Sequence, residues 1–167
     1  LIAAQRSRRS LDELIDRTPA DGLVAGIGRV NGDLFDDAAA RCMVLAYDYT
    51  VLAGTQGMKN HEKKDRMLAI AARQRLPLVV FAEGGGGRPG DTDSTMAGML
   101  HPEAFTLFAQ LSGKVPLVGI VSGRCFAGNA VLAGCCDVII ATANVSLGMG
   151  GPAMIEGGGL GVFAPDD

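Results

Sequence analysis

The sequence predicts an α/β fold with a parallel β-sheet covered by helices, and three observations support this prediction. Two segments share one pattern, a basic residue, an apolar residue, a proline and an unbroken apolar run before a glycine-rich loop (RLPLVVF before EGGGGR, KVPLVGIV before SGRCFAGNA). Unbroken apolar runs are typical of strands buried on both faces of a parallel sheet. A helical pattern precedes each strand, over residues 61–74 and 102–111, so the order of elements is that of a β/α fold.

The remaining elements are predicted from hydrophobic periodicity and from turn residues. We expect further helices over residues 6–17 and 129–136, and further strands over 23–30, 43–52 and 137–142, the last of them buried. Another helix is expected to begin at Pro152, because proline is favoured in the first turn of a helix. The second half of the segment 84–99 is expected to be a surface loop.

The composition is that of a globular domain, with 48% apolar and 20% charged residues among 167. A net charge of −3 provides no basic surface, so neither nucleic acid nor an anionic membrane is an expected partner. No apolar run approaches the roughly 18 residues of a membrane span, and the cytoplasm is the expected location. The four cysteines form no Cys-x-x-Cys pair and there are two histidines, so no metal site is expected.

The two glycine-rich loops are the candidate functional site. EGGGGR lacks the spacing of a nucleotide-binding loop, and one such loop after a strand is equally well a tight turn. Right-handed crossovers, however, place both loops at the same edge of the sheet, where ligands bind. Two loops at one edge can direct backbone N–H groups to a single oxygen, and the second loop comes where a helix begins. The pair therefore predicts an oxyanion hole.

An acid or base is missing from the motifs around these loops. There is no Gly-x-Ser-x-Gly sequence for a serine hydrolase, and we expect His61 and His101 to lie on the surface. Glu83 and Glu156 are the nearest carboxylates, and each is expected to be structural or solvated. A site with amide donors alone needs its base from a cofactor or a substrate.

These motifs resemble those of a known family. EGGGGR resembles the Ser-Gly-Gly-Ala-Arg stretch of acyl-CoA carboxyltransferases, and CFAGNA resembles their Cys-x-Ala-Gly-Gly-Ala stretch. DVIIAT with its following glycines, and VLAGTQGMKNHEKKDRM, resemble two further segments, so the resemblance covers most of residues 24–165. The sequence is thus similar to the N-terminal, acyl-CoA-binding half of the carboxyltransferase domain of biotin-dependent acyl-CoA carboxylases, in the crotonase superfamily.

The resemblance implies an architecture and a set of partners. The fold is expected to be the crotonase-like (Clp protease/crotonase) β/α spiral, with residues 1–22 as a helical lead-in and 23–167 as a truncated N-terminal half without the C-terminal half. The partners implied are an acyl-CoA substrate, biotin on a carrier domain or subunit, a biotin carboxylase, the second carboxyltransferase half, and further copies in a homo-oligomer. In this scheme biotin supplies the carboxyl group and the base, and the piece alone is expected to be inactive.

The resemblance also implies roles for individual residues. Gly128 and Asn129 correspond to the amide pair that faces the thioester oxygen, where they hold an enolate. The substrate-binding residues implied are Gly85, Gly86, Gly87 and Arg88 on the CoA side, and Gly151 and Pro152 at the helix start beneath the pocket. Asn129 stands where the family has glycine, and Gly87 stands where it has alanine. We expect the Asn129 side chain to narrow the approach to the amides.

Two alternatives to this function and one binding expectation remain. A crotonase-type enoyl-CoA hydratase, isomerase or acyl-CoA decarboxylase would use the same hole with Glu156 as its acid–base group, and a non-catalytic assembly module would need no chemistry. Arg88 is expected to bind CoA phosphate, because guanidinium binds phosphate in a bidentate manner. The other basic residues near the pocket in sequence are Lys59, Lys63, Lys64 and Arg66, each of which alternatively lies on a solvated helix face.

Overall fold

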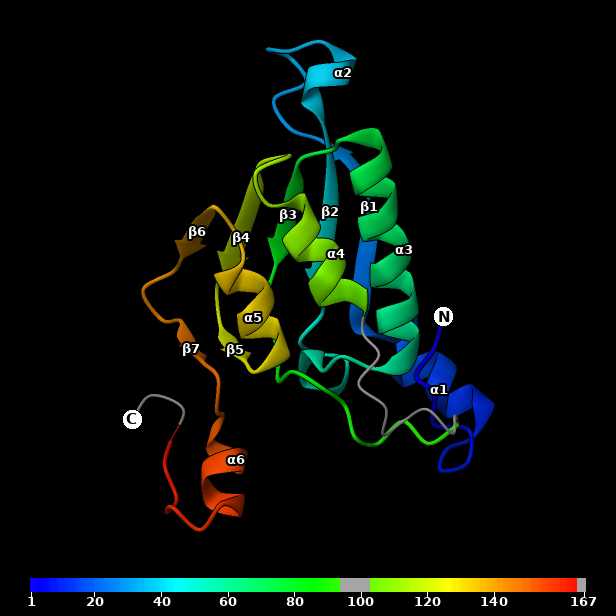
Figure 1. Ribbon diagram of the computed structural model, residues 1–167. Coiled ribbons are helices and arrows are strands. Elements are labelled where there is room, and N and C mark those ends of the chain that lie inside the picture. The colour runs from blue at the N-terminus through cyan, green and yellow to red at the C-terminus, as the bar shows by residue number, and fades with distance from the viewer. Residues whose placement is uncertain (94–102, 165–167) are drawn as a thin grey trace.

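The computed structural model describes residues 1–93 and 103–164, and its centre is a five-stranded sheet in the order β1-β2-β3-β4-β6 (Figure 1). β1 (Leu23–Arg29) is antiparallel to β2 (Arg41–Tyr47). β2, β3 (Leu78–Phe81), β4 (Leu117–Val121) and β6 (Val138–Ala141) run parallel. A second, two-stranded parallel sheet consists of β5 (Arg124–Phe126) and β7 (Ser146–Gly148). The two predicted strand–loop units are thus neighbours in one sheet.

The helices that position the site lie on one face of this sheet. Figure 1 shows α3 (Met58–Gln74), α4 (Glu103–Leu111) and α5 (Gly128–Gly134) side by side in front of the strands. The remaining elements are α1 (Leu11–Arg17), α2 (Asp37–Ala40), α6 (Pro152–Gly157) and the 3₁₀ turns η1 (Pro19–Gly22) and η2 (Leu52–Gly54). None of the described helices is both long and apolar enough to cross a membrane.

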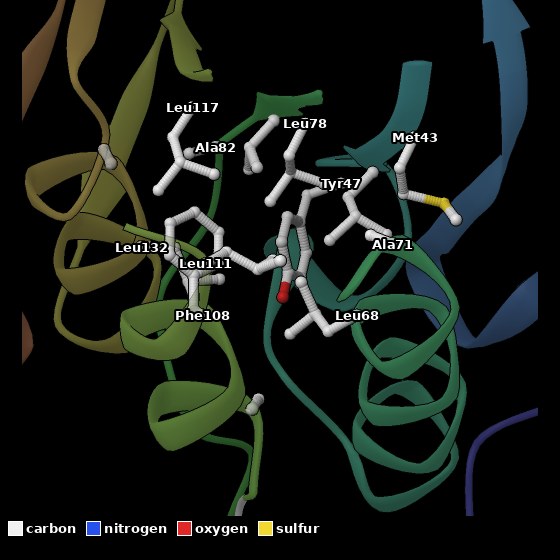
Figure 2. Packing of buried hydrophobic residues seen from close by; sticks show 14 of the residues in the cluster. Met43, Tyr47, Leu68, Ala71, Leu78, Ala82, Phe108, Leu111, Leu117 and Leu132 are labelled. Atoms are coloured by element: carbon white, nitrogen blue, oxygen red, sulfur yellow. The ribbon is translucent and has the colours of Figure 1, made fainter. Parts of the chain in front are cut away.

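The hydrophobic core lies between these helices and the sheet (Figure 2). Alternate residues of the strands point to the helices, because side chains alternate across a strand. Leu68 of α3, Phe108 of α4 and Leu132 of α5 are fully buried against them. The strand residues of this layer include Met43, Leu45, Leu78, Val80 and Leu117, all at 0% exposure. The apolar side chains that the sequence placed in strands and helices therefore form one contiguous core.

The prediction that the apolar runs form strands buried on both faces was wrong for β3 and β6, and the residues of β4 on the face away from the helices are half-buried. On the face away from the helices, the paired positions Val24, Phe81 and Ile140 are 62%, 38% and 54% exposed. The expected strand at 137–142 forms as β6, but all four of its residues are exposed. β6 is the edge strand, and the chain after it continues to β7 and α6 instead of packing over it (Figure 1).

Other boundaries differ by a few residues. β2 covers 41–47 instead of 43–52, because the chain turns at Asp48 and forms η2, and α3 begins at Met58. The short strand β5 lies inside the second glycine-rich segment, which was expected to be a loop, and β7 lies where no element was predicted. The N-terminal segment packs against the rest: Thr92 donates its amide to the Ala4 carbonyl at 2.9 Å. The expected surface loop after residue 93 lies largely outside the described residues.

Candidate active site

The two glycine-rich loops meet at the carboxyl ends of β3 and β4. We call residues 83–88 the first loop and residues 123–130 the second loop. Gly84 donates its amide to the Arg124 carbonyl at 2.7 Å, and Phe126 donates its amide to the Gly84 carbonyl at 2.9 Å. These bonds form a parallel bridge between Gly84 and Cys125, so the loops continue side by side beyond the strands. The prediction that both loops lie at one sheet edge is confirmed.

The closest approach is between Gly86 and the peptide of Ala127 and Gly128. A Cβ placed on Gly86 would lie 2.6 Å from the Ala127 Cβ and 3.0 Å from the Gly128 amide nitrogen. Gly86 also has a φ of +82°, a backbone conformation that favours glycine. Ala127 itself has a φ of 49° where the chain enters α5. Only glycine at 86 therefore allows the loops this contact.

Several backbone amides at this contact have no hydrogen-bond acceptor among the described residues. Within the described residues, the amides of Gly86, Gly87, Gly128 and Asn129 donate to no other group. The Gly85 amide, in contrast, is used internally, because it donates to the Ala53 carbonyl at 3.1 Å. The loops thus bring N–H donors without acceptors together, as an oxyanion site requires. Gly87 and Gly128 are at least partly exposed, whereas Gly86 and Asn129 are buried.

From the sequence we expected the Asn129 side chain to narrow the approach to the amides. In the structure it does not, because it is buried in the interior. Its Oδ1 accepts from Gln56 Nε2 at 2.8 Å, and its Nδ2 donates to the carbonyls of Gly54 at 3.1 Å and Glu83 at 2.5 Å. Asn129 is 0% exposed. The side chain is turned inward because these partners satisfy its polar atoms there. It fastens the second loop to the first loop and to η2.

A buried lysine continues this network and was not predicted. Lys64 Nζ donates to Gln56 Oε1 at 2.5 Å and to the Tyr47 hydroxyl at 3.0 Å. Lys64 is 0% exposed, and burial lowers its pKa to about 7. The sequence carried a signal for this burial, because Lys64 lies four residues before Leu68 on the buried stripe of α3.

Arg88 lies in the interior and not where it could hold phosphate. Its guanidinium pairs with Asp21 and Asp91, and it donates to the Thr55 carbonyl at 2.7 Å and to Thr55 Oγ1 at 2.9 Å. Its side chain is 5% exposed. The geometry therefore disagrees with the expected contact to CoA phosphate. Sequence could not show this, because the first partner, Asp21, lies 67 residues away.

The other basic candidates divide in a similar way. Lys63 Nζ donates to the carbonyls of Ala20 at 2.6 Å and Leu23 at 2.5 Å, so it joins α3 to η1 and to the first residue of β1. Lys59 is partly exposed and pairs with Glu62 at 2.7 Å, and Arg66 is exposed. Of the four, only Lys59 and Arg66 lie on the solvated face of the helix.

Gly151 and Pro152 lie next to the second loop. α6 begins at Pro152, as predicted. A Cβ on Gly151 would lie 3.4 Å from the Phe126 ring, and Ala127 donates its amide to the Gly148 carbonyl at 3.1 Å. The structure thus brings this helix start to the second loop, through Phe126.

Comparison with known proteins identifies the family. The model of the carboxyl transferase domain matches residues 3–158. The chain belongs to the carboxyl transferase family. It is 32% identical to an uncharacterised carboxylase of Bacillus subtilis (strain 168) over 84% of this chain and 27% of that protein. It is 29% identical to the biotin-dependent 3-methylcrotonyl-coenzyme A carboxylase beta1 subunit of Mycobacterium tuberculosis, over 84% of this chain and 26% of the subunit.

Solved structures agree with this membership of the carboxyl transferase family. Part of a single-chain, multi-domain long-chain acyl-CoA carboxylase superposes with a TM-score of 0.92 and 65% identity, over 99% of this chain and 16% of that one. The transcarboxylase 12S structure with methylmalonyl-coenzyme A gives a TM-score of 0.73 and 26% identity, over 95% of this chain and 29% of that one. The carboxyl transferase fold of this chain is therefore crotonase-like, as expected. The chain spans less than a third of each of these relatives.

Among the described residues, no ionisable side chain is one of the nearest neighbours of a Cβ placed on Gly86 or Gly128. Glu83 accepts a hydrogen bond from the Ser122 hydroxyl, and Glu156 is exposed on α6. His61 is half-buried instead of on the surface, and burial lowers its pKa to about 4. His101 lies outside the described residues. All four cysteines are free, and burial raises the pKa of Cys125 to about 12.

Proposed function

We propose that this chain is the acyl-CoA-binding part of a carboxyltransferase that moves a carboxyl group from carboxybiotin to the α-carbon of an acyl-CoA. The observation that carries this proposal is the contact of Gly86 with the Gly128 peptide, beside which four backbone amides donate to no group in the described part of the chain. Membership of the carboxyl transferase family supports this reaction over a hydratase, an isomerase or an assembly module.

In this proposal the amides of Gly128 and Asn129 bind the thioester oxygen. Loss of the α-proton places negative charge on that oxygen, and fixed N–H donors stabilise the resulting enolate more than the neutral thioester. Each such donor contributes about 2.7–4 kcal/mol in related oxyanion sites. Gly85, Gly86 and Gly87 follow the CoA side of the substrate, and Gly151 and Pro152 lie beneath it. Arg88 orients the first loop from inside through its bonds to Thr55.

The residues near the two loops fit a reaction whose base arrives from a partner. The atoms nearest to a Cβ on Gly86 or Gly128 belong to Ala127, Phe126, Gln56 and Phe105, besides the Gly128 amide itself. Amide and apolar groups such as these orient a substrate and exclude water, but they do not exchange protons. Biotin, when bound from its carrier, supplies the carboxyl group and the base for the α-proton.

A long acyl chain is the substrate that the comparisons favour. The 65% identity extends over 99% of this chain and is to part of a long-chain acyl-CoA carboxylase that is a single multi-domain chain. We therefore propose a long-chain acyl-CoA as substrate. The partners proposed are a biotin carboxyl carrier, a biotin carboxylase and a second carboxyltransferase half, in a cytoplasmic homo-oligomer.

The test is carboxylation by the complete protein with its biotinylated partner. We expect labelled bicarbonate to enter palmitoyl-CoA faster than acetyl- or propionyl-CoA, and avidin to block it. Gly128→Val crowds the Gln56 side chain and displaces the amides, so its kcat should fall about a hundredfold or more. Gly134→Val, at the open end of α5, is the matched control. A folded Gly128→Val enzyme with the wild-type rate, or a complete protein that carboxylates no acyl-CoA, would refute the proposal.

A further inference from the structure

Lys64 places an amine where packing alone would favour an apolar side chain. It is fully buried among the core residues of α3, and its amine has no carboxylate within ion-pair distance among the described residues. Its partners are the Tyr47 hydroxyl, Gln56 Oε1, and the rings of Tyr47 and Phe105, whose centroids lie 5.7 and 5.9 Å from Nζ. Burial of an amine is unfavourable, so a direct hydrogen-bonding role is the simplest reason for its presence.

In the row of hydrogen bonds that begins at Lys64, each side chain donates to the next one. An amine that donates to Gln56 requires the oxygen of that amide, which turns Gln56 Nε2 toward Asn129 at 2.8 Å. Asn129 must then present its own oxygen to Gln56. Its Nδ2 is left to donate to the carbonyls of Gly54 and Glu83, which can only accept. A donor at one end and backbone acceptors at the other thus fix the orientation of both amides.

Gln56 joins this row of bonds to both glycine-rich loops. The backbone N–H of Gln56 donates to the Gly86 carbonyl at 2.6 Å, and its backbone carbonyl accepts from the Arg88 backbone N–H at 3.0 Å. Its side chain contacts the second loop, where a Cβ on Gly128 would lie 3.1 Å from Nε2. The backbone of Gln56 therefore holds the first loop, and its side chain holds the second.

We propose that Lys64, Gln56 and Asn129 are positioning residues that hold the Gly128–Asn129 peptide at its distance from the first loop. The proposal rests on the proposed carboxyltransferase function, because it explains how the free amides keep the geometry that an enolate needs. Displacement of catalytic groups by about 1 Å can cost roughly a hundredfold in rate. These side chains act through the backbone and contact no reacting atom.

Two substitutions break the row of bonds without removing volume. Gln56→Glu keeps the acceptor for Lys64 but removes the donor to Asn129 Oδ1, so the protein should fold while the second loop loses its tether. Lys64→Met keeps an apolar chain of similar length and leaves Gln56 free to turn its amide. We expect each to lower kcat by about 10- to 100-fold, with the KM for acyl-CoA changed by less than about threefold.

Lys63→Met is the matched control. Lys63 is the neighbouring residue of the same helix and makes two hydrogen bonds of similar length, but its acceptors are the carbonyls of Ala20 and Leu23. Its loss should lower the melting temperature while kcat stays within about twofold, because its bonds do not reach the loops. If the role of Lys64 were purely structural, Lys64→Met would likewise lower the melting temperature and leave kcat nearly unchanged.

The experiment measures steady-state kinetics and hydrogen–deuterium exchange on the complete protein with its biotinylated partner. We expect faster exchange in residues 84–88 and 124–132 for Gln56→Glu and Lys64→Met, and unchanged exchange there for Lys63→Met. If Lys64→Met does not fold, Gln56→Glu carries the test. Wild-type kcat in Gln56→Glu, or a higher KM at unchanged kcat, would overturn the positioning role alone. A wild-type protein without carboxyl transfer would overturn the proposed function instead.

Discussion

Arg88 and Asp21 form an ion pair inside the protein, with 2.5 Å between Nη1 and Oδ1 and side chains that are 5% and 0% exposed. The second carboxylate oxygen of Asp21 accepts from the Asn60 amide at 2.8 Å. The pair joins the end of the first loop to η1 and to the first turn of α3. Arg88, which the sequence led us to expect at the CoA phosphate, thus stabilises the first loop from the interior.

The first prediction concerns the stability of this pair. Arg88→Met should leave the Asp21 carboxylate buried without its partner, and removal of one member of a buried pair costs about 3–5 kcal/mol. Chemical denaturation of the chain measures this free energy of unfolding. The control is Lys59→Met, which removes a partly exposed pair with Glu62 and should cost less than about 1 kcal/mol. A stable Arg88→Met protein whose complete enzyme has a higher KM for acyl-CoA would restore the phosphate-binding role.

The elements predicted well from sequence are those that a local pattern encodes. The apolar runs, prolines and glycines of two segments were enough to place β3 and β4 together with both loops at one edge. The buried polar contacts could not be predicted, because they join residues far apart in the chain. The hydrogen bond from Gln56 to Asn129 spans 73 residues, and no periodicity in either segment indicates it. The exposure of β6 depends likewise on which elements cover the sheet edge, and not on its own apolar sequence.

The second prediction concerns the contact between the loops. Gly86→Ala combines a φ of +82° with a Cβ that would lie 2.6 Å from the Ala127 Cβ. We expect a loss of at least about 2 kcal/mol of stability from this strain and crowding, and a fall of about a hundredfold in carboxyl transfer by the complete protein. Thermal unfolding and turnover are the measurements.

Gly113→Ala is the control that distinguishes backbone strain from crowding, the two effects combined in Gly86→Ala. Gly113 has a φ of +72°, but a Cβ added there would have no neighbour within 4 Å, and the residue lies between α4 and β4. The variant should lose about 1–2 kcal/mol of stability while the carboxyl transfer rate is unchanged. If both alanine variants behave alike, close contact of the loops is not needed for the reaction.

The third prediction is a pH dependence of stability that comes from His61. Its Nδ1 is buried without a hydrogen-bond partner in the part of the chain that the structure describes. Burial, with the charges of Lys64 and Arg88, lowers its pKa from 6.5 to about 4. Between these two values the unfolded chain binds a proton that the folded chain does not, so stability falls as the pH falls through this window.

His61→Gln should remove this contribution. We expect urea denaturation between about pH 7 and pH 4 to show a decrease in stability that is smaller in the variant by roughly 1–3 kcal/mol. The lowered pKa of Lys64, at about 7, affects stability above this window and should be the same in both proteins. Identical pH profiles would show that His61 is protonated as easily in the folded chain as in the unfolded one.

The last prediction tests where the base of the reaction comes from. Glu156 is exposed on α6, four residues after Pro152, and it is the carboxylate that a hydratase or isomerase scheme would use. In the carboxyltransferase scheme the base belongs to biotin, so Glu156→Gln should keep kcat of the complete protein within about twofold. Loss of a general acid–base group would instead lower the rate about a hundredfold or more. A Glu156→Gln protein that binds acyl-CoA normally but has lost carboxyl transfer would therefore show that Glu156, and not biotin, is the base for the α-proton.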